Sequence, residues 1–249
     1  MDRLKAKRAL ITGGTSGIGL ETARQFLNEG ARIAITARDQ ASLQAAHKEL
    51  GGEALMILSD ASDVADQKRV ADTLRQTFGG LDILFVNAGI AALKPIEEWG
   101  EAAFDTSFAI NVKGPYFLIQ ALLPLFANPA SIVLNASVNA HIGMPNSSVY
   151  GATKAALLSL ARTLSGELIR RGIRVNAVSP GPISTPLYTK LGLSEADLKA
   201  VAASIQSQIP IGRFGRPGEI AQAIVFLASD ESTFAVGSEL VVDGGMINL

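Results

Sequence analysis

Two side chains that could move a proton lie four residues apart. Tyr150 and Lys154 fall in a helical pattern over Val149–Arg170, so they share one helix face. A lysine ammonium beside a phenol favours the phenolate, which predicts that the pKa of Tyr150 falls below its usual value of about 10. Ser137, 13 residues before Tyr150, ends a predicted strand and can bring its hydroxyl beside the phenol. The alternative to this acid–base site is an ordinary pair on a helix surface.

A glycine-rich turn follows the first predicted strand. After Thr12 the chain reads Gly13-Gly14-Thr15-Ser16-Gly17-Ile18-Gly19, and an amphipathic helix follows at about Leu20–Asn28. Glycines permit positive φ and let backbone N–H groups approach a pyrophosphate at the positive end of a helix. The order of strand, turn and helix therefore predicts a nucleotide-phosphate site, with a plain βα turn as the alternative.

Seven short apolar runs alternate with helical patterns and must position these residues. Runs such as Ile83–Val86 are apolar on successive residues, which is typical of parallel strands covered on both faces. Right-handed crossovers then predict a doubly wound α/β fold with a seven-stranded parallel sheet. We expect one domain over residues 1–249, with a substrate lid at about 182–216. The predicted strands are Arg8–Thr12, Arg32–Thr36, Ala54–Leu58, Ile83–Val86, Ser131–Asn135, Arg174–Val178 and Glu239–Val242.

Composition narrows the classes of partner. The chain has 22 Lys and Arg against 23 Asp and Glu, so its net charge of -1 offers no global attraction to nucleic acid or to an anionic membrane. No apolar run reaches 18 residues, which predicts a cytoplasmic protein without a membrane span. With no cysteine and two histidines, the sequence predicts neither disulfides nor a metal site.

Further short motifs follow one another along nearly the whole chain. They are Asn87-Ala88-Gly89, Asn111, Tyr150-Gly151-Ala152-Thr153-Lys154, Pro180-Gly181 and Asp243-Gly244-Gly245. Together with a glycine motif of the form T-G-x-x-x-G-x-G, they make the sequence resemble the short-chain dehydrogenase/reductase family. The resemblance implies a Rossmann domain, an oxidoreductase acting on CH-OH or carbonyl groups, and a homotetramer.

The resemblance also implies the roles of four residues. Tyr150 is the general acid in carbonyl reduction and the base in alcohol oxidation. Lys154 binds the nicotinamide ribose and lowers the pKa of Tyr150, and Ser137 polarises the carbonyl. Asn111 passes protons towards Lys154 through a water. Pro115 lacks an N–H, so we expect it to leave the Asn111 carbonyl free to hold that water.

The residues after the second predicted strand indicate which cofactor is used. Ala37 fills the place where an acidic residue would hold the ribose of NAD, and Arg38 fills the place that accepts a 2′-phosphate. NADP(H) is therefore expected, with NAD(H) as the alternative and Asp39 as a rival ribose ligand. The implied cofactor-binding residues are Gly13, Thr15, Ser16, Gly17, Ile18, Gly19, Arg38, Asp60, Ala61, Asn87, Ala88, Gly89, Tyr150, Lys154, Pro180, Gly181, Ile183 and Thr185.

The segments around the site suggest an apolar substrate. The expected reaction is reversible, NADPH-dependent reduction of a hydrophobic or aromatic ketone. The alternatives are a 3-oxoacyl-[acyl-carrier-protein] reductase, an NAD-preferring polyol dehydrogenase and a catalytically silent NADP(H)-binding regulator. A basic docking patch would distinguish the first alternative, and the cluster Arg170, Arg171 and Arg174 fits either such a patch or a helix C-terminus, where cations are favoured. The predicted substrate wall consists of Val138, Asn139, His141, Met144, Pro145, Pro182, Leu187 and Tyr188.

Overall fold

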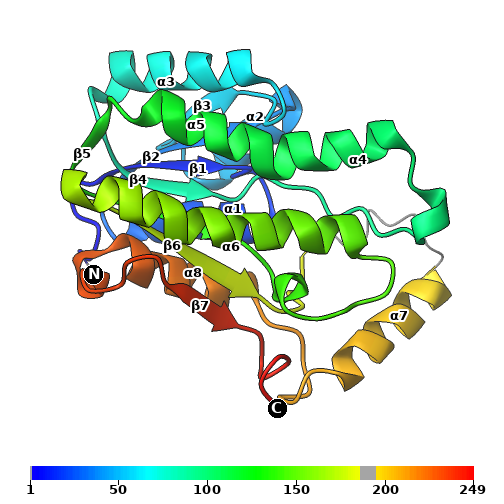
Figure 1. Cartoon of the computed structure of the whole chain (residues 1–249). Helices are drawn as coiled ribbons and strands as arrows, with labels where there is room; N and C mark the ends of the chain where they lie inside the picture. Colours follow the sequence, from blue (N-terminus) through cyan, green and yellow to red (C-terminus); the bar gives the residue numbers. More distant parts are fainter. Residues whose placement is uncertain (1, 186–194) are drawn as a thin grey trace.

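A single parallel sheet runs through the chain. The computed structural model describes residues 2–185 and 195–249, with residues 195–198 described for their backbone alone. Seven strands pair in the order β3-β2-β1-β4-β5-β6-β7, and every pairing is parallel (Figure 1). The predicted doubly wound α/β fold is confirmed. The strands are β1 Arg8–Thr12, β2 Arg32–Ala37, β3 Leu55–Leu58, β4 Leu81–Val86, β5 Phe126–Asn135, β6 Ile173–Pro180 and β7 Glu239–Val242.

Helices cover both faces of the sheet and bury two apolar cores. Successive β4 residues alternate between the cores: Leu84 joins the core under α3, α5 and α6, and Phe85 joins the core under α1, α2 and α8. This is why the strands read as continuous apolar runs. The helices are α1 Gly17–Asn28, α2 Gln40–Glu49, α3 Val64–Phe78, α4 Glu101–Phe108, α5 Gly114–Leu122, α6 Ser148–Leu168, α7 Glu195–Ser207 and α8 Pro217–Ala228.

Short helical turns connect several of these elements. Among the described residues, no helix is both long enough and apolar enough to cross a membrane. The helix α7 stands to one side of the sheet, and the C-terminus ends near it (Figure 1). The turns are η1 Ile96–Glu98, η2 Ala109–Lys113, η3 Val138–Ala140, η4 Ile169–Arg171 and η6 Asp230–Ser232.

The strand order creates the crevice that holds the site. From β1 the chain moves outward to β2 and β3, then returns to place β4 on the other side of β1. Helices that leave β1 and β4 therefore cover opposite faces, and a crevice opens beyond the carboxyl ends of these two strands. The glycine turn and Asn87 both follow strands that end there.

The strand β5 differs most from its predicted bounds. β5 begins at Phe126, five residues before the expected Ser131. Pro129 argues against a regular strand because it cannot donate to a ladder. Here it falls where the pairing between β4 and β5 shifts register, between Leu81 and Ile83. The irregular pairing accommodates the proline.

Candidate active site

The glycine-rich turn joins β1 to the N-terminus of α1. Gly13 has a φ of +64°, which residues with a Cβ rarely adopt. A Cβ added at Gly19 would lie 2.2 Å from the Gly13 carbonyl oxygen, so that position accepts only glycine. Ser16 precedes α1 without forming a side-chain cap, which leaves the first N–H groups of the helix to a ligand. The turn therefore suits a phosphate at the positive helix end.

Asn87 holds this turn against the end of β4. Its Nδ2 donates to the carbonyls of Thr12 and Gly13, both at 3.0 Å. The Thr12 hydroxyl in turn accepts the N–H groups of Asn87 at 2.9 Å and Ala88 at 3.0 Å. The side chain of Asn87 thus fixes the shape of the phosphate turn.

A groove of about 450 Å³ extends from the phosphate turn across the ends of β2 and β3. Its lining includes most of the residues expected around the adenosine half of a dinucleotide. Sequence reasoning missed Thr36, Ser59, Ile90, Ala91 and Ile110, which complete the wall together with Ala37. The predicted residues that line it are Gly13, Thr15, Ser16, Gly17, Ile18, Arg38, Asp60, Ala61, Asn87, Ala88, Gly89 and Thr185.

The two acidic residues near the groove are engaged by their own neighbours. Asp39 caps α2, since its carboxylate accepts the N–H groups of Ala41 at 3.3 Å and Ser42 at 2.8 Å. Asp60 accepts both the N–H and the hydroxyl of Ser62, at 2.8 and 2.7 Å. These bonds, with a smaller contribution from the charge of Arg38, lower the pKa of Asp60. Asp39 is therefore used as a helix cap, while Arg38 remains at the exposed rim of the groove.

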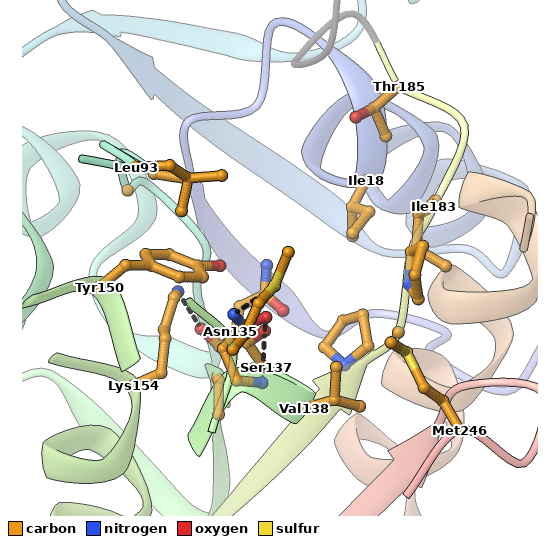
Figure 2. Close-up of a pocket in the computed structure, with 18 of the residues that line it drawn as sticks. Ile18, Leu93, Asn135, Ser137, Val138, Tyr150, Lys154, Ile183, Thr185 and Met246 are labelled. Atoms are coloured by element: carbon orange, nitrogen blue, oxygen red, sulfur yellow. Dashed lines mark hydrogen bonds between the residues drawn. The ribbon is translucent and has the colours of Figure 1, made fainter. Parts of the chain in front are cut away.

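Ser137, Tyr150 and Lys154 meet at the carboxyl end of β5. Ser137 lies two residues after the end of that strand, and Tyr150 and Lys154 lie one turn apart in α6 (Figure 2). Lys154 Nζ lies 5.6 Å from the centre of the Tyr150 ring and donates to the main-chain carbonyl of Asn135 at 2.6 Å. Ser137 Oγ accepts the N–H of Asn139 at 3.2 Å. The structure thus brings the predicted trio together.

Burial sets the protonation of this trio. It raises the pKa of Tyr150, and a hydrogen bond with the Ser137 hydroxyl lowers that pKa to a smaller extent. Burial also lowers the pKa of Lys154 from 10.5 to about 8. The predicted lowering of the tyrosine pKa by the lysine is therefore not what the protein's own groups produce, because the effect of burial on the phenol is the largest contribution.

Asn111 ties the segment after β4 to α6. Its side chain accepts the N–H of Ile90 and donates to the Ile90 carbonyl, both at 2.9 Å, and donates to Thr153 Oγ1 at 3.0 Å. The expected helix becomes a π-helical turn here, in which the Gly114 N–H bonds to Ala109 five residues earlier. Pro115 follows this widened turn. Because proline has no backbone N–H, it fits a place where the regular hydrogen bonding of the helix is interrupted.

A second cavity of about 240 Å³ opens over the trio. Tyr150 lies on one side of it, and Val138 and Met246 lie on the other (Figure 2). The structure places the expected Val138, Asn139, Met144 and Pro182 on the wall, and Leu187 and Tyr188 lie outside the described residues. The predicted nicotinamide-side residues on the same wall are Ile18, Asn87, Gly89, Tyr150, Lys154, Pro180, Gly181, Ile183 and Thr185.

Other parts of the wall differ from expectation. His141 and Pro145 are not among the described lining residues. The ring of His141 turns to Glu239, with Nε2 at 2.6 Å from Oε1. Sequence reasoning missed Ile90, Ala91, Leu93, Asn135, Ala136, Ile205, Gln208 and Met246, which complete the cavity. The terminal Asp243-Gly244-Gly245 motif precedes Met246 and was the available signal for it.

Comparison with known proteins gives the class that this fold and site define. A family model described as enoyl-(acyl carrier protein) reductase matches residues 13–247. The chain belongs to the short-chain dehydrogenase/reductase family of oxidoreductases, which act on CH-OH or carbonyl groups and bind a nicotinamide cofactor.

Similar proteins cover the whole chain. Oxidoreductase asL5 of Sarocladium schorii is 39% identical over 100% of this chain and 99% of its own length. The NADP-dependent (R)-specific alcohol dehydrogenase of Lentilactobacillus kefiri is 38% identical over 98% of both chains. The L-sorbose reductase of Gluconobacter frateurii, solved with NADPH and L-sorbose, is 34% identical with a TM-score of 0.93 over 100% of both chains.

Proposed function

We propose that this protein reduces an uncharged ketone to a secondary alcohol with NADPH, and that the reaction is reversible. The observation that carries the proposal is the setting of Tyr150, a half-buried phenol whose raised pKa keeps it protonated beside the Ser137 hydroxyl. A protonated phenol can give its proton to a developing alkoxide. Among the described residues around the cavity, Lys154 is the one charged side chain, and it belongs to the catalytic trio. An uncharged substrate fits this lining.

The residues present fit a nicotinamide dinucleotide. The Gly13–Gly19 turn leaves no room for a Cβ at Gly19, and uncapped N–H groups begin α1. When bound, the cofactor supplies a hydride to the carbonyl carbon. Ser137 holds the carbonyl oxygen by hydrogen bonding, and Tyr150 transfers its phenolic proton to that oxygen as negative charge develops.

Two further residues support the proton transfer. After the phenolic proton leaves, the Lys154 ammonium stabilises the phenolate electrostatically. Lys154 also holds the nicotinamide ribose, as its place in the family pattern implies. Asn111 orders the chain beside α6 through Ile90 and Thr153, and its main-chain carbonyl holds the relay water. In the oxidative direction Tyr150 acts as the base.

The adenosine end supports NADPH over NADH. Arg38 lines the groove and offers a cation to a 2′-phosphate, whereas the carboxylate of Asp39 is used to cap α2. The Lentilactobacillus kefiri enzyme carries NADP-dependence in its name, and the L-sorbose reductase was solved with NADPH. These observations together favour the 2′-phosphorylated cofactor.

A 3-oxoacyl-[acyl-carrier-protein] reductase is the second candidate. A protein so named from Thermotoga maritima is 36% identical over 98% of this chain. Of the arginine cluster that a docking patch would use, Arg174 is buried and donates to the carbonyls of Leu227 and Ser229 at 3.1 Å. Arg171 donates to the Leu123 carbonyl at 2.6 Å. This arrangement favours a small ketone over a carrier-bound substrate.

The testing experiment follows cofactor oxidation with NADPH and, separately, with NADH. The substrate panel contains aryl ketones, 3-oxo esters, acyl thioesters and L-sorbose. We expect turnover of aryl ketones or 3-oxo esters with NADPH. Preference for acyl thioesters would establish the carrier-linked candidate, and preference for L-sorbose would establish a polyol enzyme. Tight NADPH binding without any turnover would establish the silent regulator.

We also propose that the chain forms a homotetramer. Apolar side chains are exposed beside the edge strand β7, where Phe234 is fully exposed and Phe226 is 37% exposed. Such a group of apolar residues is typical of a protein–protein contact. A single species at four times the chain mass in sedimentation equilibrium would support the tetramer, and a monomeric mass would refute it.

A further inference from the structure

Asn135, the last residue of β5, forms hydrogen bonds both with Lys154 and with Asn87, the residue that holds the phosphate turn. Its main-chain carbonyl accepts Lys154 Nζ at 2.6 Å. Its side-chain Nδ2 donates to Asn87 Oδ1 at 3.0 Å. Figure 2 shows Asn135 beside Ser137 and Lys154 at the base of the cavity.

The orientation of the Asn135 amide is fixed by its neighbours. Asn87 Nδ2 donates to the carbonyls of Thr12 and Gly13, so Asn87 must present its oxygen towards Asn135. A flipped Asn135 amide would place two oxygens against each other. The Asn135 Oδ1 therefore points away from its only side-chain partner. In the described part of the chain it is the one buried side-chain oxygen or nitrogen without a hydrogen bond.

Burying an oxygen without a hydrogen-bond partner costs free energy of folding. This cost disfavours an asparagine at position 135 unless its side chain has another role. A leucine of similar size would fill the same space without an unsatisfied acceptor. Val133, two residues earlier on the same strand face, is fully buried and apolar. Packing alone thus favours an aliphatic residue at position 135. What a leucine lacks is the N–H bond to Asn87.

We propose that Asn135 is a positioning residue for Lys154, whose side-chain amide anchors the end of β5 to the phosphate turn and so fixes the carbonyl that holds the lysine ammonium. The chain of bonds runs from Gly13 through Asn87 and Asn135 to Lys154. This inference rests on the proposed function, since it assigns Lys154 to the nicotinamide ribose. A fixed acceptor stabilises the ammonium, so its loss lowers the lysine pKa further below about 8.

The test measures cofactor binding, which needs no ketone. For N135L and N135A we expect the Kd of NADPH to rise about tenfold, about 1.4 kcal/mol. The Kd of 2′,5′-ADP, which lacks the nicotinamide riboside, should change less than twofold, because Asn87 keeps its bonds to the turn. The decline of NADPH affinity with rising pH should also begin at lower pH than in the wild type.

Two comparisons separate positioning from general loss of structure. Asn176 lies on the next strand, is fully buried, and pairs its amide with Ala235 and Ser238 at 2.9 Å. We expect N176L to lower the unfolding temperature. It should change the Kd of NADPH and the Kd of 2′,5′-ADP by the same factor relative to the wild type. In a double-mutant cycle, N87A combined with N135A should weaken NADPH binding less than the sum of the single variants.

Equal losses for NADPH and 2′,5′-ADP in both Asn135 variants would overturn the proposal, since Asn135 would then serve the phosphate turn alone. Unchanged NADPH affinity together with an unchanged pH dependence would also overturn it. Failure of the proposed function looks different: the wild type would bind NADPH with the expected pH dependence and reduce no ketone.

Discussion

Replacing Lys154 by methionine should make the protein more stable and inactive. Lys154 is only 5% exposed, and burial lowers its pKa from 10.5 to about 8. Keeping the ammonium buried at pH 7 therefore costs about 3 kcal/mol of folding free energy. Methionine removes that cost and loses the bond to the Asn135 carbonyl, worth about 1 kcal/mol. We expect K154M to be about 2 kcal/mol more stable at pH 7.

The pH dependence identifies the cause of this gain. The cost of the buried ammonium is fully present below pH 8, where the lysine is charged in both states. It disappears as pH rises from 8 to 10.5, because there the folded state has released a proton that the unfolded state still binds. The advantage of K154M should therefore shrink over this range.

Urea denaturation followed by circular dichroism at pH 7, 9 and 10.5 measures the effect. The matched control is K48M, which replaces an exposed lysine on α2 and should stay within about 0.5 kcal/mol of the wild type at each pH. A K154M protein that is less stable than the wild type at pH 7 would refute the reasoning. So would an advantage that does not shrink as the pH rises.

Three further predictions address the cofactor groove and the cavity wall. R38L should weaken NADPH binding about 10- to 100-fold with little effect on NADH, because a charged bond to the 2′-phosphate is lost; equal losses measured by fluorescence titration would contradict this role. G19A should abolish detectable NADPH binding, since its Cβ would lie 2.2 Å from the Gly13 oxygen; binding within threefold of the wild type would contradict it. H141A should leave kcat/KM within about twofold, because the ring pairs with Glu239 off the cavity wall, and a tenfold loss would place the histidine in the reaction.

The strands were predictable because both faces of the sheet are buried. Strands such as β1 and β7 match their predicted bounds, and the doubly wound order follows from alternation with helices. The early part of β5 was not predictable, since Pro129 reads as a break and its place depends on a register shift with β4. Local residue types do not reveal such a shift between strands.

The meeting of Ser137, Tyr150 and Lys154 was predictable because parallel strands bring their carboxyl ends to one edge. The direction of the Tyr150 pKa was wrong at the sequence level, because spacing shows that Lys154 is near and does not show how deeply both groups are buried. Leu93 and Met246 were missed since their place in the cavity depends on the paths of two connecting segments. Arg174 reads as a surface charge, and only the packing of β6 against the C-terminal end of α8 shows its buried carbonyl partners.

Steady-state reduction of an aryl ketone by NADPH, compared between wild type and Y150F, tests the central claim most directly. Phenylalanine keeps the half-buried ring and removes the proton that Tyr150 donates to the carbonyl oxygen. We expect kcat/KM to fall by about 10²- to 10⁴-fold while the Kd of NADPH stays within a few-fold of the wild-type value. A Y150F protein that retains more than a tenth of the wild-type kcat/KM would contradict the assignment of Tyr150 as the general acid.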